Sequence, residues 1–387
     1  MSAAAAPTNT AAPLALVRGC GPTGALAALA LCDAGWRVQL HDPSSKEQLL
    51  ARQRAYALTH SSQMLLQRLN LWDGLAAQLI AFGQLDLADL GSGSAQVCFD
   101  ADALGLSAVG WIAEHRALMQ VLLQALESSD SVQLSLGTAA PADNSCSVDL
   151  IVAADGPQSP TRSTLGIDCW RWHYGQQCLT AQVDLRGSSA QQAFELFRPE
   201  GPMALLPLGG QRVQLVWSAA PARCRQLQTL TANGFLDHLA GVLPDRFQPD
   251  QLITGPQSFD VGLALARRLQ RGRTLLLGES AHCSHPVGGQ GLNLCWRDVA
   301  VLHRLARRVQ AGRLGASALP RQYALRRWPD LLLTLAATDL LVRVFSNRNA
   351  VLLPLRRLAL AVLARSQVLR RVTLGVMTHG PCRLTRG

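Results

Sequence analysis

The segment Gly19-Cys-Gly-Pro-Thr-Gly24 constrains the fold more than any other part of the sequence. It has the spacing G-x-G-x-x-G and lies between an apolar run at residues 14–17 and a run of small residues at 25–32. The apolar run predicts a strand, the small residues predict a helix, and residues 38–40 predict a second strand. In such a turn the first glycine permits the sharp bend, the second lets a phosphate approach the backbone, and the third lets the helix pack on the strand. The sequence therefore predicts a βαβ opening suited to a dinucleotide.

Asp42 adds a second, independent signal for a nucleotide. It lies 23 positions after Gly19, just past the second predicted strand. A carboxylate at this place accepts hydrogen bonds from the ribose of a bound nucleotide, while the N-terminus of the helix offers free N–H groups to its phosphates. The glycine pattern, its context and Asp42 together favour dinucleotide binding over a purely structural turn.

The rest of the chain predicts an α/β protein with an inserted antiparallel sheet. With 387 residues, 48% of them hydrophobic and 16% charged, it can bury a large core in two or three domains. A mixed-polarity helical stretch is expected up to about residue 75, and residues 111–126 predict an amphipathic helix that leads to a strand at 148–153. Period-two runs between residues 179 and 219 predict antiparallel strands, whereas everything after residue 291 predicts helices.

Positive charge is concentrated in the last quarter of the chain. The net charge is +10, and from Arg297 onward there are 17 arginines against three acidic residues. Two interpretations stay open, a solvated helical face and a surface attracted to anionic lipid. Nucleic acid is disfavoured as a partner, because leucine-rich stretches separate the arginines where base-stacking aromatics would be needed.

Composition also suggests a location and excludes some chemistry. The ten cysteines show no C-x-x-C pair and no Cys/His ligand spacing, so we expect reduced thiols and no metal site. No window reaches the roughly 18 apolar residues of a membrane span, and no positive charge precedes Arg18 to form a secretory signal. We expect a cytoplasmic protein.

Two further segments carry chemistry. Ala154-Asp-Gly-Pro-Gln-Ser-Pro-Thr-Arg162 directly follows a predicted buried strand. Gly278-Glu-Ser-Ala-His-Cys-Ser-His-Pro-Val-Gly-Gly-Gln-Gly-Leu-Asn293 follows another, at residues 274–278. Each alone is compatible with an ordinary strand-to-turn connection. In this order and spacing, the three segments resemble the fingerprints of the FAD-dependent aromatic hydroxylases, the class A flavoprotein monooxygenases.

The resemblance is strongest to the ubiquinone-biosynthesis hydroxylases of the UbiH/UbiF-like group, and it extends over nearly the whole chain. It is carried by residues 111–116, 197–207, 289–298, 338–340 and 345–347. Glu279 stands where the group has aspartate, and Cys295 stands where it has glycine. The resemblance implies a Rossmann-like FAD-binding domain with an inserted antiparallel-sheet substrate domain and a C-terminal helical region.

The resemblance also implies which residues bind FAD. For the pyrophosphate and the adenosine ribose it implies Gly19, Gly21, Pro22, Thr23, Gly24 and Asp42. For the rest of the cofactor it implies Arg54, Arg116, Asp155, Gly156, Arg162, Gly278, Glu279, Pro286, Gly288, Gly289, Gly291, Leu292 and Asn293. Pro286, Gly289 and Gln290 are implied as the loop beside the reactive flavin ring, with no protein acid or base assigned.

The domain boundaries follow from the same segments. Residues 12–75, 100–170 and 264–315 are expected to form the discontinuous FAD-binding domain. Residues 76–99 and 171–263 are expected to form the substrate-binding sheet, and residues 316–387 the basic helical region.

In the activity that the resemblance implies, NADH or NADPH reduces FAD, dioxygen reacts with the reduced flavin, and one oxygen atom is added to an aromatic ring. A polyprenylated phenol or quinone precursor is the implied substrate. The basic C-terminus would meet the inner face of the membrane, and the protein is expected to join a biosynthetic complex. Two alternatives stay open, a hydroxylase of a small soluble aromatic compound and a non-catalytic subunit that binds flavin or lipid. A halogenase is disfavoured, because the only lysine, Lys46, lies near the predicted adenosine end.

Overall fold

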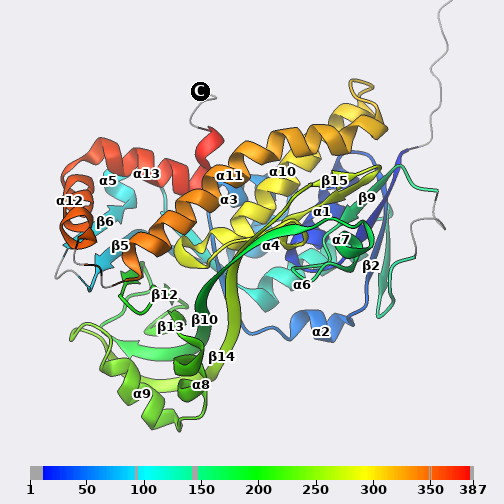
Figure 1. Cartoon of the computed structure of the whole chain (residues 1–387). Coiled ribbons are helices and arrows are strands. Elements are labelled where there is room, and N and C mark those ends of the chain that lie inside the picture. Colours follow the sequence, from blue (N-terminus) through cyan, green and yellow to red (C-terminus); the bar gives the residue numbers. More distant parts are fainter. Residues whose placement is uncertain (1–11, 92–94, 142–146, 348, 350, 384–387) are drawn as a thin grey trace, which may run out of the picture.

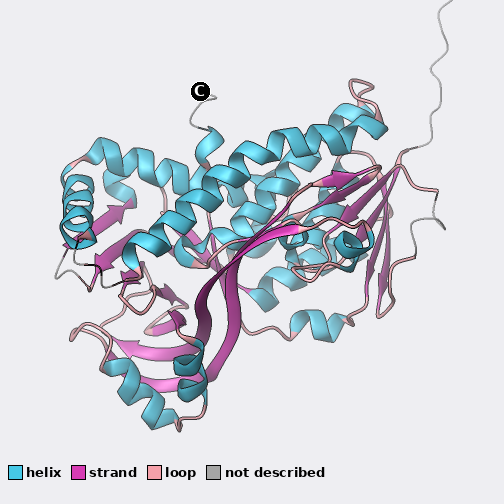
Figure 2. Ribbon diagram, viewed as in Figure 1, coloured by secondary structure: helices cyan, strands magenta, loops and turns pink. Residues whose placement is uncertain are grey.

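The computed structural model describes residues 12–91, 95–141, 147–347, 349 and 351–383. It contains three sheets with helices packed around them (Figures 1 and 2). Parts of the predicted domains, at residues 92–94, 142–146, 348, 350 and 384–387, lie outside the described residues. The domain boundaries themselves stay a prediction.

A six-stranded sheet forms the core of the first half of the fold. Its strand order is β15-β16-β9-β1-β2-β8, and all neighbours except β15 and β16 pair in parallel. The strands are β1 (Leu14–Arg18), β2 (Arg37–Asp42), β8 (Val132–Leu136), β9 (Leu150–Ala153), β15 (Gln270–Arg271) and β16 (Thr274–Leu276). The predicted βαβ opening is confirmed, with α1 (Pro22–Asp33) between β1 and β2. Pro22 at the first helical turn favours this start, since its fixed φ suits a helix and its missing N–H would be unpaired there anyway.

An eight-stranded, mainly antiparallel sheet occupies the middle of the chain. Its order is β17-β14-β10-β13-β12-β11-β5-β6, and only β11 and β5 pair in parallel. The strands are β5 (Gln84–Asp89), β6 (Ala95–Asp100), β10 (Cys169–Arg186), β11 (Gln192–Phe197), β12 (Met203–Pro207), β13 (Arg212–Ala219), β14 (Gln248–Ala266) and β17 (His282–Cys283). The long strands β10 and β14 of this sheet pair side by side and extend towards the six-stranded sheet (Figure 1). The helices α8 (Pro221–Gln228) and α9 (Ala232–Ala240) pack on the second sheet.

A small antiparallel sheet corrects part of the sequence prediction. It consists of β3 (Ala55–Leu58), β7 (Gly110–Glu114) and β4 (Ile80–Phe82). The helix predicted over residues 111–126 therefore starts too early, because β7 ends at Glu114 and α6 (His115–Glu127) begins only afterwards. The helical stretch predicted up to residue 75 is likewise wrong at β3, which pairs with β7. Short apolar runs fit a strand as well as a helix, and here pairing with partners distant in sequence decides.

The remaining helices cover the sheets. In the first half they are α2 (Lys46–Leu50), α3 (His60–Arg68), α4 (Trp72–Ala76), α5 (Ala101–Leu104) and α7 (Pro160–Thr164). The predicted helical C-terminal part is confirmed as α10 (Gln290–Gln310), α11 (Leu319–Phe345), α12 (Leu352–Arg365) and α13 (Gln367–His379). Short 3-10 turns lie at Gly278–Ser280, Val287–Gly289, Ala316–Ala318 and Pro381–Arg383. Within the described chain, no helix combines the length and apolarity needed to cross a bilayer.

Candidate active site

The three predicted segments leave the six-stranded sheet at one edge. Arg18 ends β1, Ala153 ends β9 and Leu276 ends β16; the sheet register pairs Arg18 with Ala153 and Ala153 with Leu276. The segments that begin at Gly19, Ala154 and Leu277 therefore start from the carboxyl ends of three adjacent parallel strands. Open sheets of this kind bind ligands in the crevice outside those ends. The structure thus brings the three segments together, as the account from sequence requires.

Two glycines of the first segment are required by packing. Gly19 has φ +100°, and a Cβ there would lie 2.3 Å from the carbonyl oxygen of Ala154. A Cβ at Gly24 would lie 1.9 Å from the carbonyl oxygen of Gly19. A side chain at Gly19 would therefore push the first segment away from the second, and a side chain at Gly24 would push α1 away from the turn at Gly19.

Four other glycines leave open backbone in the same region. A Cβ at Gly21, Gly156, Gly288 or Gly291 would meet no atom of the described residues within 4 Å. Gly21 is also the N-cap of α1, where N–H groups lack helical partners and the helix dipole is positive. This open backbone at a helix N-terminus, next to the two other segments, fits the pyrophosphate of a dinucleotide such as FAD.

Asp42 ends β2, beside the first segment. It is 8% exposed, and its carboxylate accepts hydrogen bonds from the backbone N–H groups of Cys20 at 2.6 Å and Ser44 at 2.7 Å. An ionised carboxylate has about four acceptor positions, so it can hold the turn and still accept from a ribose hydroxyl.

Arg162 ties the second segment to the third. Its guanidinium is buried and donates to the carbonyl oxygens of Ser280 at 2.7 Å and Pro157 at 2.9 Å. Ser280 in turn donates from its hydroxyl to the carbonyl oxygen of Ala153 at 2.6 Å. Asp155 fixes the start of α7, because its carboxylate accepts from the hydroxyl of Ser159 and from the N–H of Thr161 at 3.0 Å. Arg162 and Asp155 therefore hold the backbone of this region in place.

A buried charge network anchors the third segment to the C-terminal helices. Asp298 of α10 accepts from the N–H of Gly278 at 2.8 Å and from Nε2 of His282 at 2.7 Å, and it forms an ion pair with Arg327 of α11. Burial alone would raise the pKa of Asp298, but the charges of Arg327 and His282 outweigh burial and lower this pKa to about 2. Asp330 extends the network by pairing with both Arg327 and Arg297. The turn at Gly278 is thus fixed by a carboxylate that stays ionised at neutral pH.

The loop predicted to lie beside the flavin ring has an unusual backbone. Gly288 and Gly289 both have positive φ, +68° and +61°, and α10 begins directly after them. Asn293 is fully buried, and its side chain donates to the carbonyl oxygens of Ala57 and Gly289 at 2.7 Å each. The oxygen of its side-chain amide accepts from the hydroxyl of Ser62 at 2.7 Å. The side chain of Asn293 therefore holds the loop against α3, while its role towards FAD stays a prediction.

His285 precedes this loop as a neutral side chain. Burial lowers the pKa of His285 to about 4. Its Nδ1 accepts from the N–H of Val287 at 3.2 Å, so the proton is assigned to Nε2, which faces the side-chain oxygen of Gln176 at 3.3 Å. Gln290 donates from its side chain to the carbonyl oxygens of Gly288 and Met377.

The other predicted residues lie around the same region. Glu279 is exposed, and its charge contributes to the raised pKa of Cys283 and Cys295, behind burial as the main cause. Thr23 meets the third segment, since a Cβ on Gly278 would lie 2.9 Å from its methyl group. Arg54 and Arg116 flank the paired strands β3 and β7, and Arg54 lies over the ring of Phe259 at 5.3 Å.

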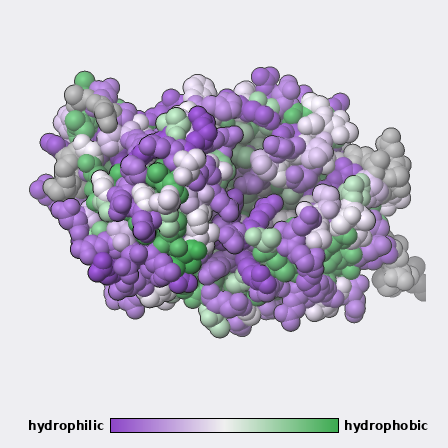
Figure 3. All heavy atoms as spheres, turned by 90° about the horizontal axis from the view of Figure 1, so that it is seen from below, coloured by the Kyte–Doolittle hydropathy of each residue, from purple (hydrophilic) through white to green (hydrophobic). Residues whose placement is uncertain are grey.

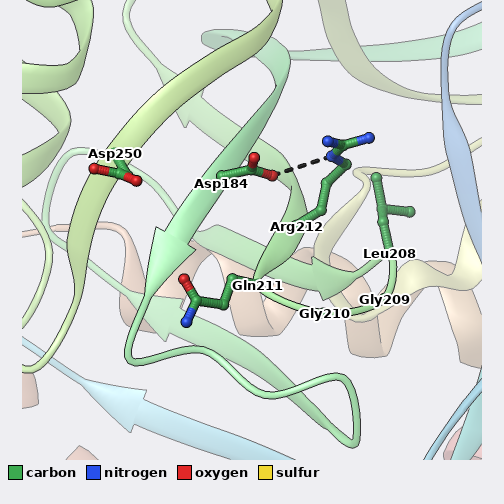
Figure 4. A pocket seen from close by; sticks show the side chains of 7 residues that line it. All are labelled: Asp184, Leu208, Gly209, Gly210, Gln211, Arg212 and Asp250. Atoms are coloured by element: carbon green, nitrogen blue, oxygen red, sulfur yellow. Dashed lines mark hydrogen bonds and ion pairs between the residues drawn. The ribbon is translucent and has the colours of Figure 1, made fainter.

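Two surface pockets lie towards opposite ends of β10. One, of about 390 Å³, is lined by Arg162, Ser163, Gly166, Ile167, Asp168, Cys169, Arg171 and Arg267. Its three arginines make it suited to an anion next to the second segment. The other, of about 320 Å³, is drawn in Figure 4, contains the ion pair of Asp184 and Arg212, and includes none of the predicted site residues. Seen from below, the surface is largely hydrophilic and is hollowed near the centre of the view (Figure 3).

One buried carboxyl group was missed by sequence reasoning. Glu195 of β11 is 7% exposed, and its Oε2 accepts from the N–H of Gly288 at 3.2 Å. Burial raises the pKa of Glu195 to about 7. In the sequence Glu195 is a single glutamate within the strand Gln192–Phe197. Nothing in the sequence alone places this glutamate beside a loop 93 residues away.

Comparison with known proteins agrees with this geometry. A model of the FAD binding domain family matches residues 122–327. The chain is 34% identical to the ubiquinone hydroxylase UbiL of Rhodospirillum rubrum, covering 96% of this chain and 92% of that protein. It is 30% identical to the 3-demethoxyubiquinol 3-hydroxylase of Escherichia coli, covering 95% and 98%.

The fold also matches solved structures. The p-nitrophenol 4-monooxygenase PnpA of Pseudomonas putida superimposes with a TM-score of 0.77 at 18% identity, covering 96% of this chain and 98% of that one. A likeness at this identity concerns the fold alone. From the family model, which matches more than half of the chain, and from relatives at 30% identity or more over nearly all of it, we conclude that this chain belongs to the FAD-dependent aromatic hydroxylases, in the group of the ubiquinone-biosynthesis hydroxylases.

Proposed function

We propose that this enzyme hydroxylates the ring of a polyprenylated phenol or quinone precursor in ubiquinone-type biosynthesis, using FAD, NADH or NADPH, and dioxygen. The observation that carries the proposal is the meeting of three cofactor-type segments at the carboxyl ends of β1, β9 and β16. The substrate class is supported by the functions of two relatives, a ubiquinone hydroxylase and a 3-demethoxyubiquinol 3-hydroxylase.

In this proposal each segment has a separate task. The first holds the pyrophosphate on the N-terminus of α1, and Asp42 accepts from the adenosine ribose. The second and third segments, joined by Arg162, lie along the middle of the cofactor, and Glu279 reaches the ribityl chain. Pro286, Gly289 and Gln290 lie beside the flavin ring, where N–H groups at the start of α10 stabilise negative charge on the reduced ring. The bound flavin supplies the redox chemistry with oxygen.

An exposed apolar surface supports a substrate taken from a membrane. We define the α11 surface as Trp170, Trp172, Leu325, Leu332, Leu333, Leu340 and Leu341, each at least 40% exposed. The two tryptophans contact α11 itself, Trp170 through Trp328 and Trp172 through the guanidinium of Arg343. Indole rings, leucines and arginines on one surface are typical of proteins that lie on an anionic bilayer. This favours the lipid interpretation of the basic C-terminus over a solvated helical face, so we place the enzyme on the inner face of the membrane.

The test compares two kinds of substrate with the purified, FAD-loaded enzyme. Geranylphenol in mixed micelles is expected to accelerate NADPH consumption, with one hydroxylated product formed for each NADPH and little peroxide released. Phenol itself is expected to accelerate the reaction far less, because it lacks the apolar tail. Equal acceleration by both would instead favour a hydroxylase of soluble aromatic compounds. If FAD stays bound and neither compound accelerates NADPH consumption, the protein is a non-catalytic subunit.

A further inference from the structure

Glu195 is an ionisable side chain that the cofactor segments do not account for. It belongs to the sheet of the predicted substrate domain, yet its carboxylate contacts Gly288 in the loop predicted to lie beside the flavin ring. It therefore lies where the sheet of the predicted substrate domain meets the loop predicted to lie beside the flavin ring. A carboxyl group that is more than nine-tenths buried is costly for folding, and such groups are concentrated at functional sites.

The surroundings of Glu195 are almost entirely apolar. The residues that pair with it on the neighbouring strands are Ala204 of β12 and Leu87 of β5. Ala193 and Phe197, two positions away on either side of Glu195 in β11, belong to one hydrophobic cluster with Val287 of the loop. A single carboxyl group among these apolar side chains provides one polar contact for a substrate that is otherwise hydrophobic.

Two ionisable groups near Glu195 are neutral at neutral pH, while Arg54 also influences Cys178 and the buried ion pair of Asp89 and Arg356 lies two residues along β5 from the partner of Glu195. Cys178 of β10 lies close enough for Glu195 to influence it, and burial is the main reason that the pKa of Cys178 rises to about 12. His285, next along the loop, is neutral because burial lowers its pKa to about 4. Burial raises the pKa of Glu195 to about 7 against the opposing effect of the hydrogen bond from Gly288, so proton uptake and release are both accessible near neutral pH.

We propose that Glu195 is a catalytic residue whose carboxylate accepts first the hydrogen bond and then the proton of the substrate's phenolic hydroxyl. This rests on the proposed function, because it needs a phenolic substrate bound beside the loop at Gly288. One carboxylate oxygen accepts from the N–H of Gly288, and the group retains acceptor capacity for the substrate. The N–H of Gly288 thus positions the carboxylate and links it to the cofactor loop.

The proton transfer is balanced without any further reagent. The O–H bond of the phenol breaks, its electron pair stays on the phenolate oxygen, and a new O–H bond forms on the carboxylate of Glu195. A phenolate donates electron density to the ring more strongly than a phenol, which favours attack by the ring on an electrophilic oxygen. After oxygen transfer the carboxyl group releases the proton to the second atom of dioxygen, which leaves as water.

Glu195→Gln is the matched variant, because the amide oxygen can still accept from Gly288 while the side chain can no longer take up a proton. With geranylphenol we expect kcat to fall about 100-fold, within the range for loss of a general base, with a smaller change in KM and unchanged FAD content. The wild-type kcat is expected to fall as the pH drops below about 7, which is the acid limb of its pH profile. The kcat of the variant is expected to lack this acid limb. Glu127→Gln, at an exposed ion pair on α6, is the control and should behave as the wild type.

A more acidic substrate separates proton transfer from a purely structural effect. Fluorinated geranylphenol ionises more readily than geranylphenol. The kcat of Glu195→Gln should therefore be at least tenfold higher with the fluorinated compound, and the kcat of the wild type should change little. A variant that keeps kcat within threefold of the wild type and retains the acid limb would overturn the proposal. Equal losses with both phenols would also overturn it.

Binding of nitrophenol gives a readout that needs no turnover. At a pH where free nitrophenol is mostly protonated, the wild type should bind it as the yellow phenolate and Glu195→Gln should bind it as the colourless phenol. The same colour with both proteins would contradict the role of Glu195. If the wild type hydroxylates neither geranylphenol nor its fluorinated analogue, the proposed function fails. The nitrophenol spectra would still decide whether Glu195 takes up the proton.

Discussion

At the scale of single residues, the site depends on side chains that hold backbone segments together. Arg162 is the clearest case, since its guanidinium joins Pro157 of the second segment to Ser280 of the third. Buried carbonyl oxygens that lose their donors cost about 1–3 kcal/mol each. A substitution at such a residue is therefore expected to disturb the backbone of the whole cofactor site.

We predict that Arg162→Ala purifies with at least tenfold less FAD than the wild type, because the second and third segments lose their connection. The bound flavin is measured by absorbance per mole of protein, and affinity by titrating the apoprotein with FAD. Arg313→Ala, an exposed arginine after α10, is the control and should keep its flavin. Normal FAD affinity in Arg162→Ala would show that the segments do not need this link.

The raised pKa of Glu195 also predicts a dependence of stability on pH. The folded protein binds the proton more tightly than the unfolded chain, so ionisation of Glu195 lowers stability as the pH rises from about 4.3 towards 7. Glu195→Gln removes this penalty while keeping an acceptor for Gly288. We expect the variant to be about 2 kcal/mol more stable near pH 8 and no more stable near pH 4, measured by urea unfolding. A gain that is equal at both pH values would argue against an ionisable, buried Glu195.

At the scale of elements, the pairing of α10 with α11 supports the third segment. Asp298, Arg327 and Asp330 form this contact together with Arg297. Removing one member of a buried ion pair leaves an uncompensated charge, which typically costs about 3–5 kcal/mol.

We therefore predict that Asp298→Asn lowers the free energy of unfolding by about 3–5 kcal/mol and weakens FAD binding, because Arg327 keeps only one of its two carboxylate partners, Asp330, and Gly278 loses a charged acceptor. Asp339→Asn on α11 breaks a partly exposed pair with Arg343 while its amide oxygen can still accept from the hydroxyl of Tyr174, so it should cost about 1 kcal/mol or less. Denaturant unfolding of both variants with bound FAD checks the contrast. Similar losses in the two variants would mean that the buried network has no special role.

Elements with a strong local pattern could be predicted from sequence, and elements defined by distant partners could not. The turn at Gly19 and the helix α1 follow from glycine spacing and small residues, and the alternation within β10 and β13 follows from period two. By contrast, β7 has the apolar run of a helix or a strand, and only pairing with β3 and β4 decides. For the same reason the sequence could indicate the glycine turns of the site and could not indicate Glu195, whose role depends on a contact between β11 and the loop before α10.

At the scale of the whole molecule, the α11 surface and the arginines of the C-terminal region predict binding to a bilayer. We expect the wild type to sediment with vesicles that contain phosphatidylglycerol and to bind more weakly to neutral vesicles, because the charges attract anionic lipid. Leu332→Glu combined with Leu340→Glu should weaken vesicle binding more than tenfold, since each leucine contributes roughly 1.5–3 kcal/mol when buried. Leu90→Glu, at an exposed leucine outside α11, is the control. Unchanged vesicle binding by the double variant would remove the membrane role of this surface.

The central claim is that this chain holds FAD where its three segments meet and uses it to add one oxygen atom of dioxygen to a phenol ring. The most direct measurement is mass spectrometry of the product formed from geranylphenol by the FAD-loaded enzyme, NADPH and isotopically labelled dioxygen. We expect one labelled oxygen atom on the ring of each product molecule. A protein that binds no FAD, or a product without label, would contradict it.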